Sequence, residues 1–223
     1  MMRFAQISVA FSAAALICGC TTAVYFVSER PAPGGDGIYR YKASDGSAVS
    51  LGPTYQAGCT PHIALDGALL YVKPVGGTNQ VFRGTRQLTT SPGDKSFPRW
   101  SPNWLAFEQT VSGVRSVVLR SHNGATEFTL ATGVETGLAF FNAGQRVAFA
   151  KSGGIYWADA ASGAAATLIE SCPVTTPIST CHLPTVSHDG TMLAYRVNVP
   201  TGPGSAEFIR DYSPTAKQIW IWQ

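Results

Sequence analysis

Two stretches of the chain, Phe97-Pro-Arg-Trp-Ser-Pro-Asn-Trp-Leu-Ala-Phe107 and Leu183-Pro-Thr-Val-Ser-His-Asp-Gly-Thr-Met-Leu-Ala-Tyr195, follow one pattern. A short apolar segment is followed by a polar turn and then by a second segment in which apolar side chains alternate, which is the signature of paired β-strands. Looser copies begin at Thr60 and Leu138. The copies therefore recur about every 40 residues, a period typical of repeat proteins.

The turn of each copy carries residues that suit tight backbone bends. Gly supplies a positive φ at little steric cost, and Asp and Asn accept hydrogen bonds from nearby backbone N–H groups. The turn residues predicted on this basis are Asp66, Gly67, Asn103, Gly144, Asp189 and Gly190.

Each copy is followed by further strand-like segments. We expect third strands at 80–83, 116–120, 154–158 and 218–222, and weaker fourth strands at 86–89, 127–130 and 166–169. The last copy then has no clear fourth strand, and its Pro- and Gly-rich stretch 198–216 is expected to be a long connection. No helical periodicity of useful length appears after the N-terminal segment.

Four-stranded antiparallel units with this period predict an all-β fold, a β-propeller. The stretches "FPRWSPNWLAF" and "LPTVSHDGTMLAYR" resemble the repeat of TolB-like β-propellers. The resemblance implies one propeller domain over residues 20–223, with repeats starting near 60, 97, 138 and 183. It is specific for the fold, because the matching residues build turns and sheet contacts.

Residues 23–52 contain three more strand-like segments and are expected to form a first, partial blade. The chain then has about four to five blade equivalents. A closed propeller must hide its sheet edges, and one solution is that strands from the two termini share a blade. The other is that the chain is an incomplete propeller or an open arc, and the sequence does not choose between them.

The N-terminus reads as an export signal. Arg3 precedes a short apolar run that ends in Ile17-Cys-Gly-Cys20, which resembles a bacterial lipobox. The resemblance implies a signal peptide at 1–19 and acyl chains on Cys20, which would anchor the protein to a membrane. Thr21 favours the outer membrane, facing the periplasm, under the usual lipoprotein sorting rule. An ordinary secretory signal cut after Ala23 is the alternative.

The remaining cysteines are free to oxidise in an exported protein. Cys172 and Cys181 flank a short Pro- and Thr-rich segment, which makes their bridge the simplest pairing. A Cys59–Cys181 bridge is the alternative, because both precede equivalent repeat motifs. No spacing of cysteines and histidines indicates a zinc site, so no metal is expected.

Composition excludes several classes of function. Charged residues are 13% of the chain and the net charge is +3, without a long basic cluster, which argues against nucleic-acid binding. No G-x-S-x-G elbow or phosphate-binding loop is present, and Ser187-His-Asp189 cannot form a triad because adjacent side chains do not converge. We therefore predict no catalytic residue and no cofactor.

A few residues remain as candidates for binding. Trp104 stands where the repeat expects Gly, so we expect it to be exposed. Arg210, Asp211 and Tyr212 belong to the long stretch 198–216, and connections of this kind often carry function. His62 and His188 occupy nearly equivalent repeat positions and are expected to approach the central channel.

These observations favour an exported, lipid-anchored and non-enzymatic module that binds an envelope protein or peptide. The alternative is an envelope propeller that binds or processes glycans, which would require paired carboxylates and stacked aromatic rings around one pocket.

Overall fold

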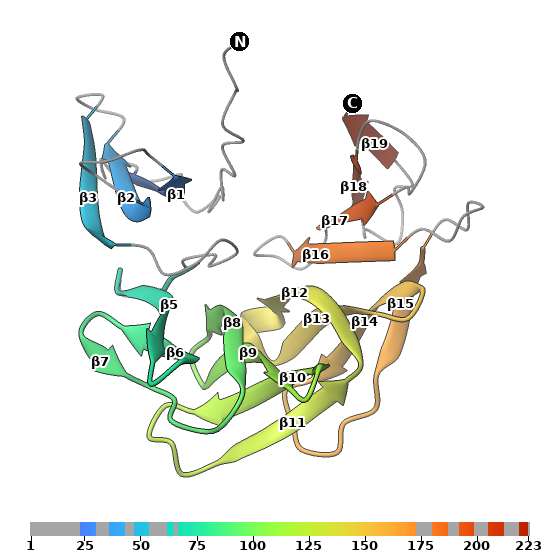
Figure 1. Cartoon of the computed structure of the whole chain (residues 1–223). Helices are drawn as coiled ribbons and strands as arrows, with labels where there is room; N and C mark the ends of the chain where they lie inside the picture. Colours follow the sequence, from blue (N-terminus) through green and yellow to red (C-terminus); the bar gives the residue numbers. More distant parts are fainter. Residues whose placement is uncertain are drawn as a thin grey trace.

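The computed structural model describes residues 23–29, 36–42, 47–53, 62–64, 67–172, 180–186, 192–198, 205–211 and 219–222 (Figure 1). Side chains are described chiefly within 67–172. The predicted signal peptide, Cys20 and Cys59 lie outside the described residues.

The described residues form five antiparallel sheets that follow one another in chain order (Figure 1). Four of these sheets have four strands, as the repeat predicted, and the all-β propeller prediction is confirmed. The first sheet has three strands: β1 (Ala23–Glu29), β2 (Asp36–Lys42) and β3 (Ser47–Pro53). The second contains β4 (His62–Ile63), β5 (Leu69–Val75), β6 (Thr78–Arg83) and β7 (Arg86–Gln87). The third contains β8 (Asp94–Trp100), β9 (Trp104–Val111), β10 (Val114–Ser121) and β11 (Glu127–Thr132).

The fourth sheet contains β12 (Val134–Phe141), β13 (Arg146–Lys151), β14 (Gly154–Asp159) and β15 (Thr167–Ser171), with a 3-10 turn, η1 (Asn142–Gly144), after β12. The fifth contains β16 (Thr180–Val186), β17 (Met192–Asn198), β18 (Ser205–Asp211) and β19 (Ile219–Trp222). Of the predicted turn residues, Gly67, Asn103 and Gly144 lie between the first two strands of their sheets. Asp66, Asp189 and Gly190 lie outside the described residues.

The last sheet corrects one expectation. Residues 198–216 were expected to be a long connection, but Ser205–Asp211 forms β18, which pairs with β17 along its whole length. The segment 218–222, expected as a third strand, contains β19, the fourth strand of this sheet. The strand has seven residues, and it was not predicted because Pro and Gly residues flank it and are typical of loops.

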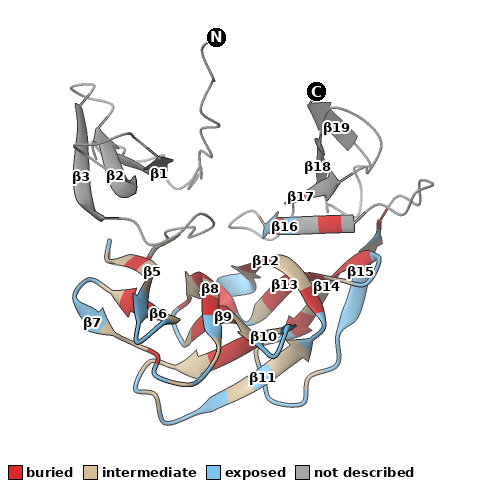
Figure 2. Ribbon diagram, viewed as in Figure 1, coloured by how far each residue is buried: buried red, intermediate tan, exposed pale blue. Residues whose placement is uncertain are grey.

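The apolar core is divided among the interfaces between neighbouring sheets. One cluster joins Leu70 and Val81 of the second sheet to Phe107 of the third, and another joins Val117 and Leu119 to Leu138 and Phe149 of the fourth. Figure 2 shows buried residues concentrated on the strands of these middle sheets. Stability therefore depends on how closely each sheet approaches the next.

Three sheets meet at Gly137, in a bulge of β12 where the pairing with β13 shifts register. Its backbone has φ +106°, and a Cβ built on it would lie 2.4 Å from the Cα of Leu183 in β16. Its N–H donates a short hydrogen bond to the carboxylate of Glu108 in β9. Gly137 thus connects the third, fourth and fifth sheets, and only Gly has the conformation and the size for this position.

Glu108 is completely buried at this junction. Its carboxylate also accepts a 3.0 Å hydrogen bond from Ser96 Oγ and lies 3.6 Å from Arg115 Nε. Arg115 in turn donates to Thr136 Oγ1 of β12. Burial raises the pKa of Glu108, and the Gly137 N–H, Ser96 and the arginines oppose that rise.

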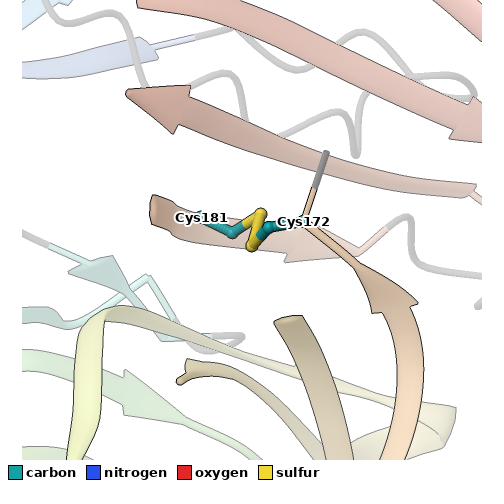
Figure 3. Close-up of a disulfide and its surroundings, with 2 residues drawn as sticks. All are labelled: Cys172 and Cys181. Atoms are coloured by element: carbon teal, nitrogen blue, oxygen red, sulfur yellow. A yellow bond between two sulfur atoms is a disulfide. The ribbon is translucent and has the colours of Figure 1, made fainter. Parts of the chain in front are cut away.

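A disulfide joins Cys172 and Cys181, with their Cα atoms 5.8 Å apart (Figure 3). It is the simpler of the two predicted pairings. The bond links the end of β15 to β16 and therefore ties the fourth sheet to the fifth. Both cysteines are buried in a cluster with Ile155, Leu193 and Tyr195.

Gly137→Ala is expected to destabilise the protein by more than about 3 kcal/mol, because the new Cβ meets backbone atoms and the φ angle is unfavourable. Urea unfolding of the full chain measures the effect. Gly163→Ala is the matched control: its φ is +75°, but nothing lies within 4 Å of the added Cβ. A loss of about 1 kcal/mol is expected there. Equal losses at the two positions would show that the close approach at Gly137 contributes nothing.

Removing the disulfide is expected to lower the free energy of unfolding by about 2–3 kcal/mol, since the bond closes a short loop in the unfolded chain. Urea unfolding with and without reducing agent measures this difference, and Cys172→Ser/Cys181→Ser should reproduce the reduced state. If the reducing agent destabilises the double variant as much as the wild type, the loss of stability does not come from the bond between Cys172 and Cys181.

Candidate functional site

The residues predicted as binding candidates do not come together in the described part of the structure. Arg210 and Asp211 lie on β18, where only the backbone is described, and Tyr212 and His188 lie outside the described residues. His62 lies on β4 and interacts with the first strand of the next sheet.

Trp104 was expected to be an exposed turn residue, and the structure corrects this. It begins β9, and its ring is partly buried in an edge-to-face contact with Phe128, with the centroids 5.3 Å apart. Its backbone N–H donates to Ser101 Oγ at 3.0 Å, so the serine closes the turn that a Gly was expected to form. Trp104 is therefore a packing residue.

A different cluster lines a concave surface between the second and third sheets. A hollow of about 460 Å³ adjoins a smaller one of about 140 Å³, and the two share Arg86, Leu88, Trp100 and His122. We call this surface the cationic groove. Its remaining residues used below are Arg83 and Pro102 in the larger part, and Leu105, Arg120 and Asn123 in the smaller part.

A tight hairpin supplies two of the cations. Arg83 ends β6 and Arg86 begins β7, and the two residues pair directly across the hairpin. Tyr71 Oη donates a 2.8 Å hydrogen bond to the carbonyl of Gly84 within this turn. The hairpin therefore places both arginines at the same end of the second sheet.

Trp100 organises the other side of the groove. The imidazole of His122 stacks on its indole with centroids 3.8 Å apart and planes 8° from parallel. The guanidinium carbon of Arg83 lies 4.7 Å from the centroid of the same ring. A cation–π contact and a ring stack thus fix an arginine and a histidine from two different sheets on one aromatic platform.

The connection between β7 and β8 is held firmly, which places the hairpin relative to Trp100. Lys95 is buried, and its Nζ donates to the carbonyls of Ser91, Pro92 and Gly93 at 2.5–2.7 Å. Thr89 Oγ1 accepts from the N–H of Val81 in β6 and donates to the side chain of Gln80. These bonds close the connection on itself and tie it to β6.

The electrostatic character of the groove is positive. Arg83, Arg86 and Arg120 line it, and no carboxylate appears among its described lining residues. Arg120 has a partner, Glu127, at 2.6 Å. His122 Nε2 is buried and has no hydrogen-bond partner among the described residues. Such a surface is suited to an anion that accepts hydrogen bonds from the arginines and the imidazole.

Sequence reasoning missed this groove. The sequence predicted no binding role for Trp100, Arg83, Arg86 or His122. The Arg83-Gly-Thr-Arg86 turn was an available signal, since a hairpin of that length places the two arginines opposite each other. His122 carried no comparable signal, because its partner belongs to a different strand.

A second polar contact lies where the second sheet meets the third. The pKa of His62 is lowered to about 3, chiefly by burial and also by the charge of Arg99 on β8, while a hydrogen bond with the Trp100 backbone opposes the shift. Burial also lowers the pKa of Arg99 to about 10, against the influence of Glu108. His62 is therefore neutral near pH 7, which makes it a structural contact between two sheets.

Other sites receive no support from the described residues. Among them, no three His, Cys, Asp or Glu side chains gather in an arrangement that would hold a metal ion. In the same part of the chain, no helix has the length and apolar character needed to cross a membrane.

The fold is similar to that of solved β-propellers. TolB from Acinetobacter baumannii matches with a TM-score of 0.65 and 15% identity, over 85% of this chain and 49% of that one. A putative TolB from Agrobacterium tumefaciens gives the same score and identity, over 89% of this chain and 76% of the other. A nidogen–laminin complex gives a TM-score of 0.60 with 14% identity, over 89% and 75%.

The chain thus corresponds to about half the length of the Acinetobacter protein. Comparison of the sequence with protein-family models and with curated proteins finds no match. The structural likeness, at these identities, shows that the fold is a TolB-like β-propeller.

Acid is expected to weaken the fold through His62. Its folded pKa lies near 3 and its unfolded value near 6.5, so stability is complete above pH 6.5 and is lost as the pH falls toward 3. Between pH 7.5 and 5 the loss should be about 2 kcal/mol. Urea unfolding at both pH values measures this loss of free energy. In His62→Gln the loss between the two pH values should be smaller by about 2 kcal/mol. Equal losses in the two proteins would contradict the assigned pKa.

Proposed function

We propose that this chain is a non-enzymatic interaction module, a TolB-like β-propeller that binds a protein or peptide. The cationic groove is the observation that carries the proposal. It is concave, it is assembled from two sheets, and Arg83 and His122 are held against Trp100 before any ligand arrives. Preorganised groups of this kind favour binding, because little side-chain freedom remains to be lost.

The same proposal places the module in the bacterial envelope. It rests on the sequence Ile17-Cys-Gly-Cys20, which resembles a lipobox, and on acylation of Cys20. The anchor would hold the propeller at the outer membrane on the periplasmic side. A disulfide between Cys172 and Cys181 suits that oxidising compartment.

The glycan alternative receives less support. It requires two carboxylates that face each other in one pocket. Glu108 is engaged between sheets, Glu127 is paired with Arg120, and Asp159 lies 3.2 Å from Arg146. These three carboxylates have structural partners, and none of them lines the cationic groove.

Cross-linking in cells tests the function. The tagged full-length chain is expected to capture a discrete envelope protein, identified by mass spectrometry, and Cys20→Ala should lose it because the variant cannot be acylated and lacks the lipid anchor. Metabolic labelling with a fatty-acid analogue measures acylation of Cys20 independently. An acylated, folded protein that captures no specific partner would contradict the interaction module. Capture that is unchanged in Cys20→Ala would contradict the role of the anchor.

A further inference from the structure

The two parts of the cationic groove form one continuous surface, because Arg86, Leu88, Trp100 and His122 line both. Arg83 lines the larger part, Arg86 lines both, and Arg120, which is paired with Glu127, lines the smaller part. A ligand that extends through both parts would therefore meet positive charge mainly at Arg83 and Arg86. An elongated ligand with its anionic groups at that hairpin fits this distribution.

The cations are arranged as a binding site would require. Arg83 and Arg86 pair directly across the hairpin, so one anion can accept hydrogen bonds from both guanidinium groups. The buried Nε2 of His122 lacks a partner in the described structure, and with its proton on that atom it would donate to a ligand oxygen. The described residues thus leave the hydrogen-bonding capacity of this nitrogen unfulfilled.

The walls indicate which kind of anion would bind. Leu88 and Pro102 add apolar surface next to the charges. The ring of Trp100 is already in contact with Arg83 and His122, so it is not available to stack on a sugar. A ligand that carries carboxylates next to aliphatic side chains would match both the positively charged and the apolar parts of the groove. Acidic peptides offer that combination.

We infer that the cationic groove binds an acidic peptide segment, with carboxylates held by Arg83, Arg86 and His122 and aliphatic side chains against Leu88 and Pro102. This inference rests on the proposed function as an interaction module and names the chemistry of its partner. The carboxylates would form charge-assisted hydrogen bonds with the paired guanidinium groups. Binding should weaken as salt rises, since part of the attraction is between partly exposed charges.

The test measures fluorescence anisotropy of a labelled peptide of alternating leucine and glutamate on the full-length protein. A peptide with glutamine in place of glutamate is the neutral counterpart. We expect the acidic peptide to bind and the neutral one to bind at least about tenfold more weakly. Equal binding of the two peptides would overturn the inference, and so would the absence of binding.

Arg83→Gln/Arg86→Gln is expected to weaken binding of the acidic peptide by about tenfold or more. Arg146→Gln is the matched control, because Arg146 also lies over an indole, that of Trp157 at 4.0 Å, but lies outside the groove and pairs with Asp159. It should leave affinity within about twofold of the wild type. Thermal melting confirms that both variants are folded. An equal loss in Arg146→Gln would show attraction by overall charge and would overturn the site.

Two further measurements separate the possible ligands and the two proposals. Binding of an acidic oligosaccharide such as oligogalacturonate, without binding of the peptide, would replace the peptide by an acidic sugar. The cellular cross-linking is then repeated with Arg83→Gln/Arg86→Gln. Loss of the captured protein supports the groove as its binding site. If the partner is still captured and the acidic peptide does not bind, the groove inference fails and the interaction module stands.

Discussion

The close backbone contact at Gly137 is the constraint on which the arrangement of the middle sheets depends. Its Cα leaves room for Leu183 of β16, and its N–H reaches the buried carboxylate of Glu108 in β9. A buried carboxylate destabilises a fold unless its oxygens are hydrogen-bonded. Here Ser96, Gly137 and Arg115 provide these interactions, and two of the three belong to the same sheet as Glu108. The third comes from the next sheet, so the burial of Glu108 is compatible only with one relative placement of the two sheets.

This constraint explains why the apolar clusters can be small. Each cluster lies between two sheets and contains side chains from both, such as Leu70 with Phe107 and Val117 with Leu138. Apolar contacts carry little directional information, whereas a hydrogen bond to a buried charge has a defined geometry. The apolar side chains thus provide most of the attraction, and Glu108 and the disulfide between Cys172 and Cys181 define the register in which the sheets meet.

The sequence predicted the fold better than the candidate site, because strands depend on local patterns and the site depends on contacts between distant segments. Strands such as β9 and β13 follow from alternation and turn residues, which are local in sequence. Strand β18 was missed because flanking Pro and Gly residues dominate its local pattern, although its pairing with β17 is regular. Trp104 was expected in a turn because a Gly was missing there, and Ser101 Oγ replaced the expected turn chemistry. The groove depends on Trp100 meeting Arg83 and His122 from other strands, and such contacts between distant segments leave no periodic signal.

The location of the groove also follows from the architecture. Residues inside the four-stranded sheets are engaged in ladders or in the interfaces with neighbouring sheets, so substitution there affects the fold itself. The hairpin between β6 and β7 and the turn after β10 lie at strand ends. Side chains there are needed neither for strand pairing nor for packing between sheets. Lys95 and Thr89 hold the intervening connection through several hydrogen bonds, which gives these strand-end residues a rigid support. A rigid support keeps Arg83 against Trp100, because a mobile hairpin would lose this cation–π contact. The surface proposed to receive an anion is therefore built from strand ends whose positions the interface between the second and third sheets already defines.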